Sequence, residues 1–283
     1  MTFLQLLKVS RPHFWLYEFG TFIIGCLIGY LATGSLDSWH FILIFGLYFL
    51  IPGNLLIYGI NDVFDYETDL RNPRKTGLEG VLPKPHHRIV LTWVIFSTLP
   101  FAIVALSLPT SVFIWFVAFI FFAVGYSLPP VRAKARPGLD SFFSGSHYVA
   151  TGVFGFVLVA PDSPLAWLLI IAALLWTFAM HAYSAVPDIS ADTEAGVPTI
   201  ATAFGGHAVL TTCLFLYSSS FFILSLYTQP WFILMALPYV YLVYKSYHKT
   251  EAQQVELYRY FPYLNALVGA VLTIYLILLI QAL

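Results

Sequence analysis

The sequence turns acidic at Asn61-Asp62-Val63-Phe64-Asp65-Tyr66-Glu67-Thr68-Asp69, directly after a long apolar run. A second acidic stretch, Asp188-Ile189-Ser190-Ala191-Asp192, follows another apolar run much further along the chain. We call these stretches the first and second ladders. Each contains two aspartates four residues apart, a spacing that puts both carboxylates on one face of a helix. Like charges so placed repel each other, so each pair costs stability unless a cation binds between them.

The composition of the 283-residue chain is that of a membrane protein. Hydrophobic residues make up 59% of the chain, charged residues make up 10%, and the mean hydropathy is +0.82. Such a chain is not an ordinary soluble domain, and its net charge of −1 gives no sign of nucleic-acid binding. A membrane-spanning helix needs about 20 apolar residues. We therefore predict an all-α membrane protein with nine transmembrane helices, at residues 14–33, 41–60, 89–107, 111–128, 141–160, 165–187, 208–227, 230–246 and 261–281.

The basic residues predict how these helices cross the membrane. With nine helices, all 13 Lys and Arg residues lie on the side of the N-terminus, before helix 1 and after helices 2, 4 and 8. The positive-inside rule places this side in the cytoplasm. Both ladders lie on the same side, at the ends of helices 2 and 6. We predict an integral protein of the cell membrane whose N-terminus and functional loops face the cytoplasm.

The chain is expected to form a single domain over residues 1–283, with a weak internal repeat. Helices 1–4 and 5–8 make two four-helix units, each with a ladder at the cytoplasmic end of its second helix, and helix 9 is left over. Cys26 and Cys213 lie inside predicted helices. Their positions indicate apolar packing, because no disulfide framework or zinc spacing is present.

The paired ladders predict a metal site. A single acidic stretch at a helix end is often only a solvated face, but a second one in the equivalent position makes that explanation weak. Mg²⁺ prefers a few carboxylates together with water and phosphate oxygens, so two converging ladders suit Mg²⁺ that holds a diphosphate. The amide of Asn61 is suited to bind a phosphate oxygen or a metal. The candidate metal ligands are Asp62, Asp65, Asp69, Asp188 and Asp192.

Two basic segments supply cations for such a diphosphate. The segment just after the first ladder contains Arg71, Arg74 and Lys75. Ordinary positive-inside charge explains this segment about equally well. In the other segment, Arg132, Lys134 and Arg136 alternate along the chain. In an extended chain, this alternation points all three side chains the same way.

Polar residues inside the predicted helices are costly in lipid and are expected to face the bundle interior. These residues are Glu18, Asn54, His147 and His181. His181 lies about two turns before the second ladder, and Tyr58 lies about two turns before Asp65 in the first. Both side chains are therefore expected to line a pocket next to the metals. For Asn54 and His147, hydrogen bonding between helices is an equally good explanation.

A resemblance to a known family follows from these motifs. The chain is similar over its whole length to the UbiA superfamily of intramembrane prenyltransferases, which has nine helices and acidic motifs after helices 2 and 6. A segment of the form Tyr…Pro-Pro-x-Arg-x-Lys-x-Arg-Pro between helices 4 and 5 begins at Tyr126. The family's first motif reads N-D-x-x-D-x-x-x-D, and it is matched here by Asn61, Asp62, Asp65 and Asp69.

The chain departs from the family's common motifs at two places. The family's second motif is often D-x-x-D-x-x-x-D; here Asp188 and Asp192 fill its last two acidic positions, but Ala185 stands at the first. The common R-P-L-P stretch after the first motif is also absent. The strings Asn72-Pro73-Arg74-Lys75-x-Gly77-x-Glu79-Gly80 and Ser184-Ala185-x-Pro187-Asp188-Ile189 are most similar to the lycopene elongase branch, which makes C50 carotenoids.

The resemblance implies a Mg²⁺-dependent prenyltransferase of carotenoid biosynthesis. Its donor is an allylic diphosphate, dimethylallyl diphosphate, and its acceptor is lycopene, which enters from the membrane lipids. The implied catalytic residues are Asp65, Asp69, Asp188, Asp192, Tyr58 and His181. The implied substrate-binding residues are Asn61, Arg71, Lys75, Arg132, Lys134 and Tyr126. The proton lost after transfer goes to Tyr58, to His181 or to the departing diphosphate, and the sequence does not choose among them.

Other functions stay open on the sequence alone. A secondary transporter also uses intramembrane carboxylates and repeats, but its sites lie near the bilayer midplane, whereas the ladders lie at helix ends. A purely structural protein does not need two repelling aspartate pairs. Among enzymes, the alternatives are prenylation of a quinone precursor or of a chlorophyll-type acceptor. An acidic aromatic acceptor needs a cation deep in the pocket, and the absence of Lys and Arg from the predicted helix interiors favours a hydrocarbon acceptor.

Overall fold

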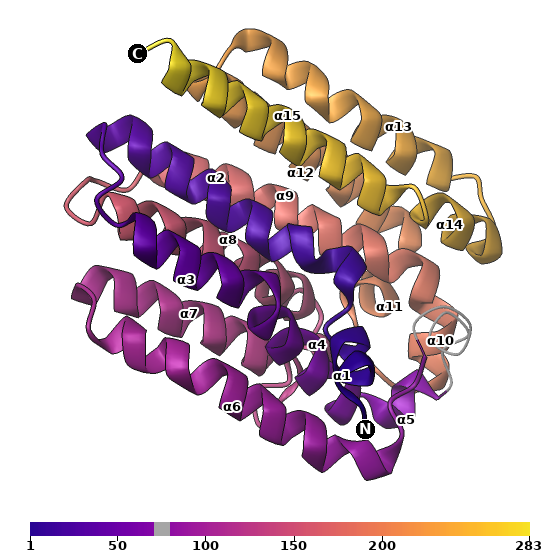
Figure 1. Ribbon diagram of the computed structural model, residues 1–283. Coiled ribbons are helices and arrows are strands. Elements are labelled where there is room, and N and C mark those ends of the chain that lie inside the picture. The colour runs from indigo at the N-terminus through magenta and orange to yellow at the C-terminus, as the bar shows by residue number, and fades with distance from the viewer. Residues whose placement is uncertain (71–79) are drawn as a thin grey trace.

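The computed structural model describes residues 1–70 and 80–283, and every regular element within these ranges is a helix. Figure 1 shows most of the long helices side by side along one direction. The predicted all-α architecture is therefore confirmed. The long helices are α2 (Trp15–Thr33), α3 (Trp39–Leu50), α4 (Pro52–Phe64), α6 (His87–Leu106), α7 (Thr110–Ser127), α8 (Leu139–Val159), α9 (Trp167–Ala185), α12 (Gly206–Tyr227), α13 (Ala236–Ser246) and α15 (Phe261–Gln281).

Shorter helices connect these long ones and gather largely at one end of the bundle (Figure 1). The short α-helices are α1 (Phe3–Val9), α5 (Tyr66–Asp69), α10 (Ile189–Glu194), α11 (Ile200–Phe204) and α14 (Glu251–Tyr258). The 3₁₀ helices are η1 (Pro12–Phe14), η3 (Lys84–His86), η4 (Ala133–Ala135), η5 (Val186–Asp188) and η6 (Pro230–Met235). Both ladders reach this group: the first runs from the end of the long helix α4 into α5, and the second lies on η5 and α10.

Within the described residues, eight helical spans are long and apolar enough to cross a membrane, and they coincide with eight of the nine predicted helices. The segment predicted as the ninth, 230–246, is helical but shorter, because it divides into η6 and α13. Pro238 lies in the first turn of α13, where its missing N–H has no helical partner to lose. The count of nine spans is therefore not confirmed.

The helix that carries the first ladder is broken at its centre. Pro52 begins α4, and the residue before it, Ile51, has a non-helical backbone, so α3 ends at Leu50. A break in a membrane span leaves carbonyl oxygens that need donors. The buried amide of Asn54 supplies them, since its Nδ2 donates to Phe49 O at 2.8 Å and to Leu50 O at 3.1 Å. This hydrogen bonding fixes α4, and with it the first ladder.

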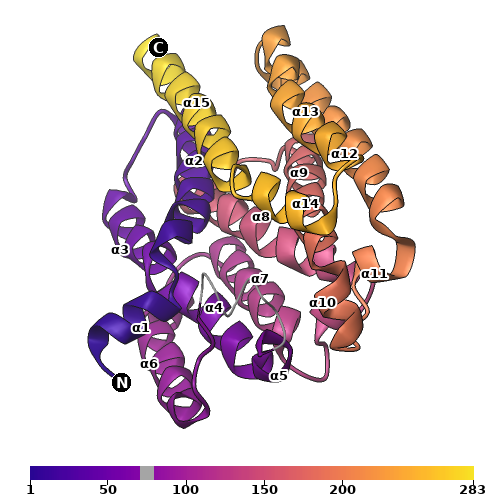
Figure 2. The same ribbon diagram turned by 90° about the vertical axis from the view of Figure 1, so that its right-hand side faces the viewer.

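Helix α8 lies in the interior and packs against α2, α7 and α9 (Figure 2). Its contact with α2 is close because glycines face each other across the two helices. A Cβ atom added to Gly25 of α2 would lie 1.9 Å from the carbonyl oxygen of Gly152, and one added to Gly155 of α8 would lie 2.3 Å from that of Phe22. Such small-residue seams are how membrane helices approach closely. The seam positions α2 against α8, the two helices that open the predicted four-helix units.

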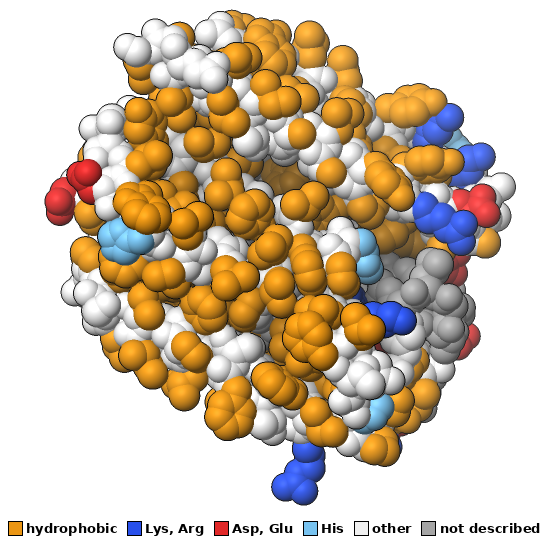
Figure 3. Space-filling model, in the orientation of Figure 1, with side chains coloured by type: hydrophobic (Ala, Val, Ile, Leu, Met, Phe, Trp, Pro, Cys, Tyr) orange, Lys and Arg blue, Asp and Glu red, His pale blue; other side chains and the backbone are white. Residues whose placement is uncertain are grey.

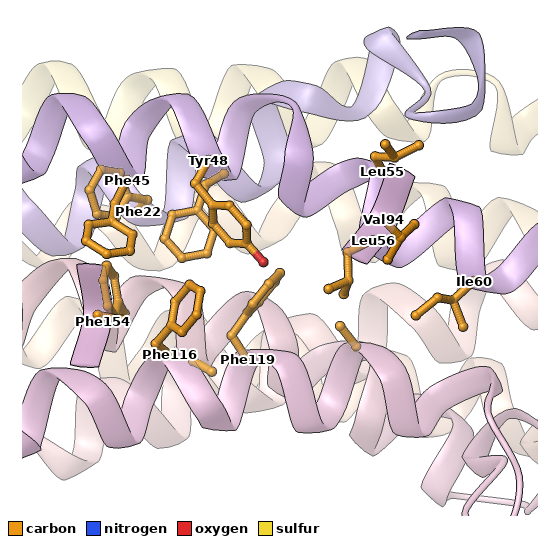
Figure 4. Close-up of a cluster of buried hydrophobic side chains, with 14 of the residues drawn as sticks. Phe22, Phe45, Tyr48, Leu55, Leu56, Ile60, Val94, Phe116, Phe119 and Phe154 are labelled. Atoms are coloured by element: carbon orange, nitrogen blue, oxygen red, sulfur yellow. The ribbon is translucent and has the colours of Figure 1, made fainter. Parts of the chain in front are cut away.

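A cluster of aromatic side chains fills the interior between α2, α3, α7 and α8 (Figure 4). Phe45 meets Phe154 with ring centroids 4.7 Å apart, and Tyr48 meets Phe116 at 5.2 Å. Many of these contacts are edge-on or tilted, which is the preferred geometry of aromatic pairs. Because lipid tails are as apolar as these rings, the cluster stabilises the bundle mainly through close packing.

The outer surface suits a lipid environment. Large apolar side chains are highly exposed there, including Phe96 at 65% and Phe215 at 71%. Figure 3 shows hydrophobic side chains across most of the visible face, with the charged side chains at its margins. Together with the eight apolar spans, this surface identifies an integral membrane protein.

Candidate active site

Both ladders face one cavity of about 230 Å³, which we call the ladder cavity. The short helices that complete the ladders, α5 and α10, lie near one another in both ribbon views (Figures 1 and 2). The long helices α2, α4, α7, α8, α9 and α15 supply most of the remaining wall. Nine of the predicted site residues line it: Tyr58, Asn61, Asp65, Asp69, Tyr126, Lys134, His181, Asp188 and Asp192.

The two ladders share a local backbone geometry. Asp65 has φ −102° and ψ 5°, and it joins α4 to α5. Asp188 has φ −105° and ψ 5°, and it joins η5 to α10. In the first ladder, the Asp69 N–H donates to the Asp65 carbonyl at 2.8 Å, which keeps the helical spacing across the break. The repeated junction supports the predicted internal repeat and aims both aspartates of each pair into the cavity.

Asp65 is the most deeply buried carboxylate of the first ladder, with 2% of its side chain exposed. The Lys134 ammonium lies 2.5 Å from its Oδ1 atom, and the Asn61 amide donates to its Oδ2 atom at 2.6 Å. Asn61 also donates to the Ser127 hydroxyl at 3.2 Å, which ties the ladder to the end of α7. A buried carboxylate needs a nearby cation and hydrogen-bond donors to offset its lost hydration. Lys134 supplies that cation, and it thereby places a positive charge at the centre of the site.

Asp62 is positioned differently from the other ladder residues. It does not line the ladder cavity; its carboxylate accepts a hydrogen bond from Arg11 at 2.7 Å. Arg11 itself lines the cavity and stacks over the Tyr58 ring, 4.5 Å from its centroid. Asp62 thus holds Arg11 at the cavity wall, and its role as a metal ligand stays a prediction.

The basic loop after α7 is not extended, so the prediction that its three cations point the same way is wrong. Residues 133–135 form the tight turn η4, and Arg132 before it has a left-handed backbone with φ 38°. Lys134 turns inward to Asp65, whereas Arg136 donates to the Pro130 carbonyl at 3.0 Å on the exposed side. Arg132 lines a neighbouring hollow, whose wall also includes Glu67.

The second ladder is fastened from outside by α14. The backbone N–H of Ser190 donates to Glu251 at 2.8 Å, and the Ser190 hydroxyl donates to the other oxygen of that carboxylate at 2.5 Å. These bonds hold the start of α10. They therefore also fix Asp188, the first aspartate of the second ladder, at the junction of η5 and α10. Asp188 and Asp192 are both less buried than Asp65.

His181 is held by a hydroxyl at each ring nitrogen. The Tyr126 hydroxyl lies 2.9 Å from Nε2, and the Ser141 hydroxyl lies 3.1 Å from Nδ1. Ser141 is in turn next to Asp140, which accepts from the Ser141 N–H at 2.7 Å and from the Ile200 N–H at 2.6 Å. The prediction that His181 and Tyr58 line a pocket beside the ladders is confirmed by the cavity wall.

The wall away from the ladders is largely aromatic and apolar. Phe14 stacks on Tyr58 with ring centroids 5.7 Å apart, and Tyr17 meets Tyr148 edge-on at 6.2 Å. The Asn265 amide, on α15, donates to the Tyr17 hydroxyl at 3.2 Å. Apart from Tyr58, sequence reasoning missed the aromatic residues of this wall, because 18% of the chain is aromatic and their spacing does not separate cavity positions from lipid-facing ones.

Comparison with known proteins assigns the family. Residues 21–267 match the sequence profile of the UbiA prenyltransferase family. The chain belongs to this family. It is 35% identical to a lycopene elongase/hydratase of Corynebacterium glutamicum, over 98% of this chain and 97% of that protein. It is 36% identical to a lycopene elongase/hydratase of Halobacterium salinarum, over 96% of each. A prenyltransferase of the UbiA family was the activity expected from the motifs.

The fold of the UbiA family is also found by structural comparison. A UbiA homologue from Archaeoglobus fulgidus, solved with bound DMAPP and Mg²⁺, superimposes with a TM-score of 0.73. The alignment covers 98% of this chain and 99% of the homologue, at 18% sequence identity. The two chains therefore share one architecture from end to end.

The ladder cavity of this UbiA family member fits Mg²⁺ with a diphosphate. Four carboxylates in two pairs line the cavity, and the Lys134 ammonium pairs with the most buried of them, Asp65. Within the described residues, no three His, Cys, Asp or Glu side chains are grouped so as to hold an ion by themselves. Mg²⁺ commonly keeps several waters and takes phosphate oxygens as ligands, so the two carboxylates of one aspartate pair suffice for each ion. Two further predicted diphosphate contacts, Arg71 and Lys75, lie outside the described residues.

Proposed function

We propose that this protein transfers the dimethylallyl group of dimethylallyl diphosphate to lycopene in a Mg²⁺-dependent reaction. We place the protein in the cell membrane with the ladder end facing the cytoplasm. In the predicted topology, all 13 basic residues lie on the same side as the ladders. The observation that carries the proposal is that two carboxylate pairs from distant parts of the chain line one cavity that continues into aromatic walls.

The polar end of the cavity suits the diphosphate. We assign Mg²⁺ binding to Asp65, Asp69, Asp188 and Asp192. Bound Mg²⁺ supplies positive charge to the phosphate oxygens as the allylic C–O bond breaks. Lys134 adds a direct cation at the same end, and Asn61 offers an amide donor.

The apolar end suits the allylic group and its acceptor. Tyr58 and Tyr148 line the cavity, and aromatic rings stabilise a nearby carbocation. Tyr126 and His181, joined by a 2.9 Å hydrogen bond, also line this cavity. The helix bundle excludes water from this region, which protects the cation until the acceptor double bond attacks it.

The relatives support lycopene as the acceptor. Proteins named lycopene elongase/hydratase align with this chain over nearly its full length in both a bacterium and a haloarchaeon. A carotenoid is long and insoluble in water, so it must reach the cavity sideways from the bilayer. The exposed apolar surface and the aromatic inner wall are compatible with that route.

A carboxylate-bearing aromatic acceptor is the second candidate, and Arg11 is the observation that favours it. Arg11 adds a cation to the cavity wall that the sequence analysis treated only as a topology signal. Its guanidinium is already paired with Asp62 at 2.7 Å and lies over the Tyr58 ring. A carboxylate acceptor must therefore compete with Asp62 for this cation, which makes the hydrocarbon acceptor the better fit.

The test is expression in cells that accumulate lycopene, with the pigments identified by mass. We expect carotenoids heavier than lycopene by one or two five-carbon units. The Asp65→Ala and Asp188→Ala variants should make none, because each aspartate pair needs both carboxylates to hold its ion. Asp162→Ala is the matched control, since Asp162 is exposed and lies in the loop between α8 and α9.

Unchanged lycopene in cells that contain inserted wild-type protein would reject this acceptor. Heavier carotenoids in both ladder variants would reject the two-pair metal site. Membrane fractions should contain all four proteins in similar amounts, so that loss of product reports loss of activity.

A further inference from the structure

A buried carboxylate and a buried imidazole face each other beside the ladder cavity, and the mechanism above uses neither. Glu18 on α2 is 1% exposed, and its Oε1 atom lies 2.5 Å from Nδ1 of His147 on α8. Its Oε2 atom accepts from the Thr151 hydroxyl at 2.6 Å. Both carboxylate oxygens are thus satisfied, and the imidazole is fixed in orientation by Glu18.

The imidazole of His147 borders the cavity in which the reaction is proposed to occur. His147 lines the ladder cavity, and its Nε2 atom forms no hydrogen bond with any described residue. The ring is flanked by Phe119, whose centroid is 6.5 Å away, and by Tyr148 at 4.1 Å. Because Glu18 engages Nδ1, Nε2 is the ring nitrogen left to accept a proton, and the carboxylate lies next to the imidazolium that would form.

The position along α8 suits the acceptor end of the cavity. His147 lies about two turns beyond Leu139, the first residue of α8, which at 1.5 Å per residue is roughly 12 Å along the helix axis. Lys134 and Asp65 mark the diphosphate end, outside the start of α8. His147 is therefore displaced toward the interior of the membrane, where the acceptor's carbocation forms once the new C–C bond is made.

The other candidate bases are less suited to this step. His181 meets a hydroxyl at each of its ring nitrogens, at 2.9 Å and 3.1 Å. Tyr58 presents a phenol, which is a weak base in its neutral form, and its ring lies under the Arg11 guanidinium.

We propose that His147 is the base that accepts the proton released when the acceptor's carbocation is quenched, and that Glu18 is its positioning residue. This inference rests on the proposed prenyl transfer. The C–H bond next to the cationic carbon breaks, its electron pair forms a C=C bond, and the proton moves to Nε2. If water adds to the cation first, the proton comes from that water and a tertiary alcohol results. In both cases the imidazolium is stabilised by Glu18 and returns the proton to water at the polar end.

The test uses the purified full-length protein in lipid vesicles with lycopene, dimethylallyl diphosphate and Mg²⁺. In His147→Gln, we expect product formation to fall roughly 10²-fold or more, the usual contribution of a general base. Donor affinity and the slow release of diphosphate in the absence of lycopene should stay at wild-type values, because neither involves this proton. The mass of the product shows whether a water has been added.

Glu18 is tested by its conservative variant. Glu18→Gln should slow product formation, and Glu18→Asp, which keeps a carboxylate, should recover part of the loss. Since His147→Gln leaves Glu18 buried without its partner, the double variant Glu18→Gln/His147→Gln provides a neutral pair that preserves folding. It should be as slow as His147→Gln. His207→Gln on α12 is the matched control, because His207 is exposed, and it should be fully active.

Wild-type product rates in folded His147→Gln and in the double variant would overturn the assignment. A parallel loss of donor affinity, diphosphate release and product would also overturn it, because that pattern indicates only a structural lock between α2 and α8. Failure of the proposed function looks different, since wild-type protein would then give no lycopene product at all.

Discussion

Asp65 shows what a carboxylate needs at the boundary of a membrane protein. Its side chain is almost fully buried, and it lies four residues from a second carboxylate, Asp69. The Lys134 ammonium and the Asn61 amide compensate it directly. Lys134 comes from a loop that is distant from Asp65 in the sequence. Its ion pair with Asp65 therefore joins that loop to the first ladder, and it brings a cation to the place where the diphosphate is proposed to bind.

The Lys134 side chain should therefore matter far more than its neighbours in the same loop. We predict that Lys134→Ala lowers kcat/KM for the allylic diphosphate by roughly 10²-fold, the scale of losing one direct electrostatic contact. Arg136→Ala should have little effect, because its guanidinium is directed to the Pro130 carbonyl on the exposed side. Steady-state kinetics in lipid vesicles, with both variants at equal protein amounts, measures the difference.

Equal kinetics for Lys134→Ala and Arg136→Ala would contradict this reading of the loop. The loop would then act only as a topology signal, as positive-inside charge does in many membrane proteins. The effect of Arg132→Ala on kcat/KM should fall between the two, since Arg132 lines the hollow next to the ladder cavity.

Individual residues were predictable only where a spacing carried chemistry. The four ladder aspartates, Tyr58 and His181 were expected to face one pocket, and they line one cavity. The sequence could not reveal the pairing of Arg11 with Asp62, because the two are 51 positions apart and nothing in either segment marks the contact. The prediction that the alternating cations point the same way was wrong because the segment is not extended. Arg132 has a left-handed backbone, and the chain turns there into η4.

The helices that carry the two ladders are interrupted at the ladders themselves. The sequence predicted a continuous helical face for each ladder, and the structure instead joins two helical pieces at Asp65 and at Asp188. The spacing still held, because the hydrogen bond from Asp69 to Asp65 keeps the helical repeat across the junction. The break at Ile51 and Pro52 was equally hard to foresee, since prolines are tolerated in membrane helices when nearby groups replace the lost hydrogen bonds.

The seam between α2 and α8 gives a prediction about stability at the level of elements. Gly25→Ala should destabilise the protein by about 1–3 kcal/mol, because its Cβ would lie 1.9 Å from the Gly152 carbonyl and the helices must separate. Gly20→Ala on the same helix is the matched control, since a Cβ there has nothing within 4 Å. Thermal unfolding in one detergent compares the two variants.

Removing a glycine from a helix also lowers the entropy of the unfolded chain. Gly20→Ala should therefore be neutral or slightly stabilising, by up to roughly 1 kcal/mol. A melting temperature for Gly25→Ala equal to that of Gly20→Ala would show that α2 and α8 are not held as closely as the seam requires. The Glu18–His147 pair crosses the same seam, so loss of the seam is expected to lower activity as well.

At the scale of the whole molecule, two half-sites from distant parts of the chain meet across one cavity. The first helices of the two predicted units, α2 and α8, pack together, and the two ladders share one junction geometry. The fold class and the family were predictable because composition and motif spacing extend over the entire sequence. The span count was not, since 230–246 is near the length limit and divides into η6 and α13.

The most direct test of the central claim is a competition assay with purified protein in lipid vesicles. Labelled dimethylallyl diphosphate is supplied with equal amounts of lycopene and 4-hydroxybenzoate, in Mg²⁺ or in excess EDTA. We predict that the label moves to lycopene, that 4-hydroxybenzoate stays largely unlabelled, and that EDTA stops the transfer. Label on 4-hydroxybenzoate with lycopene untouched would contradict the acceptor, and transfer that continues in EDTA would contradict the metal-bound diphosphate at the ladders.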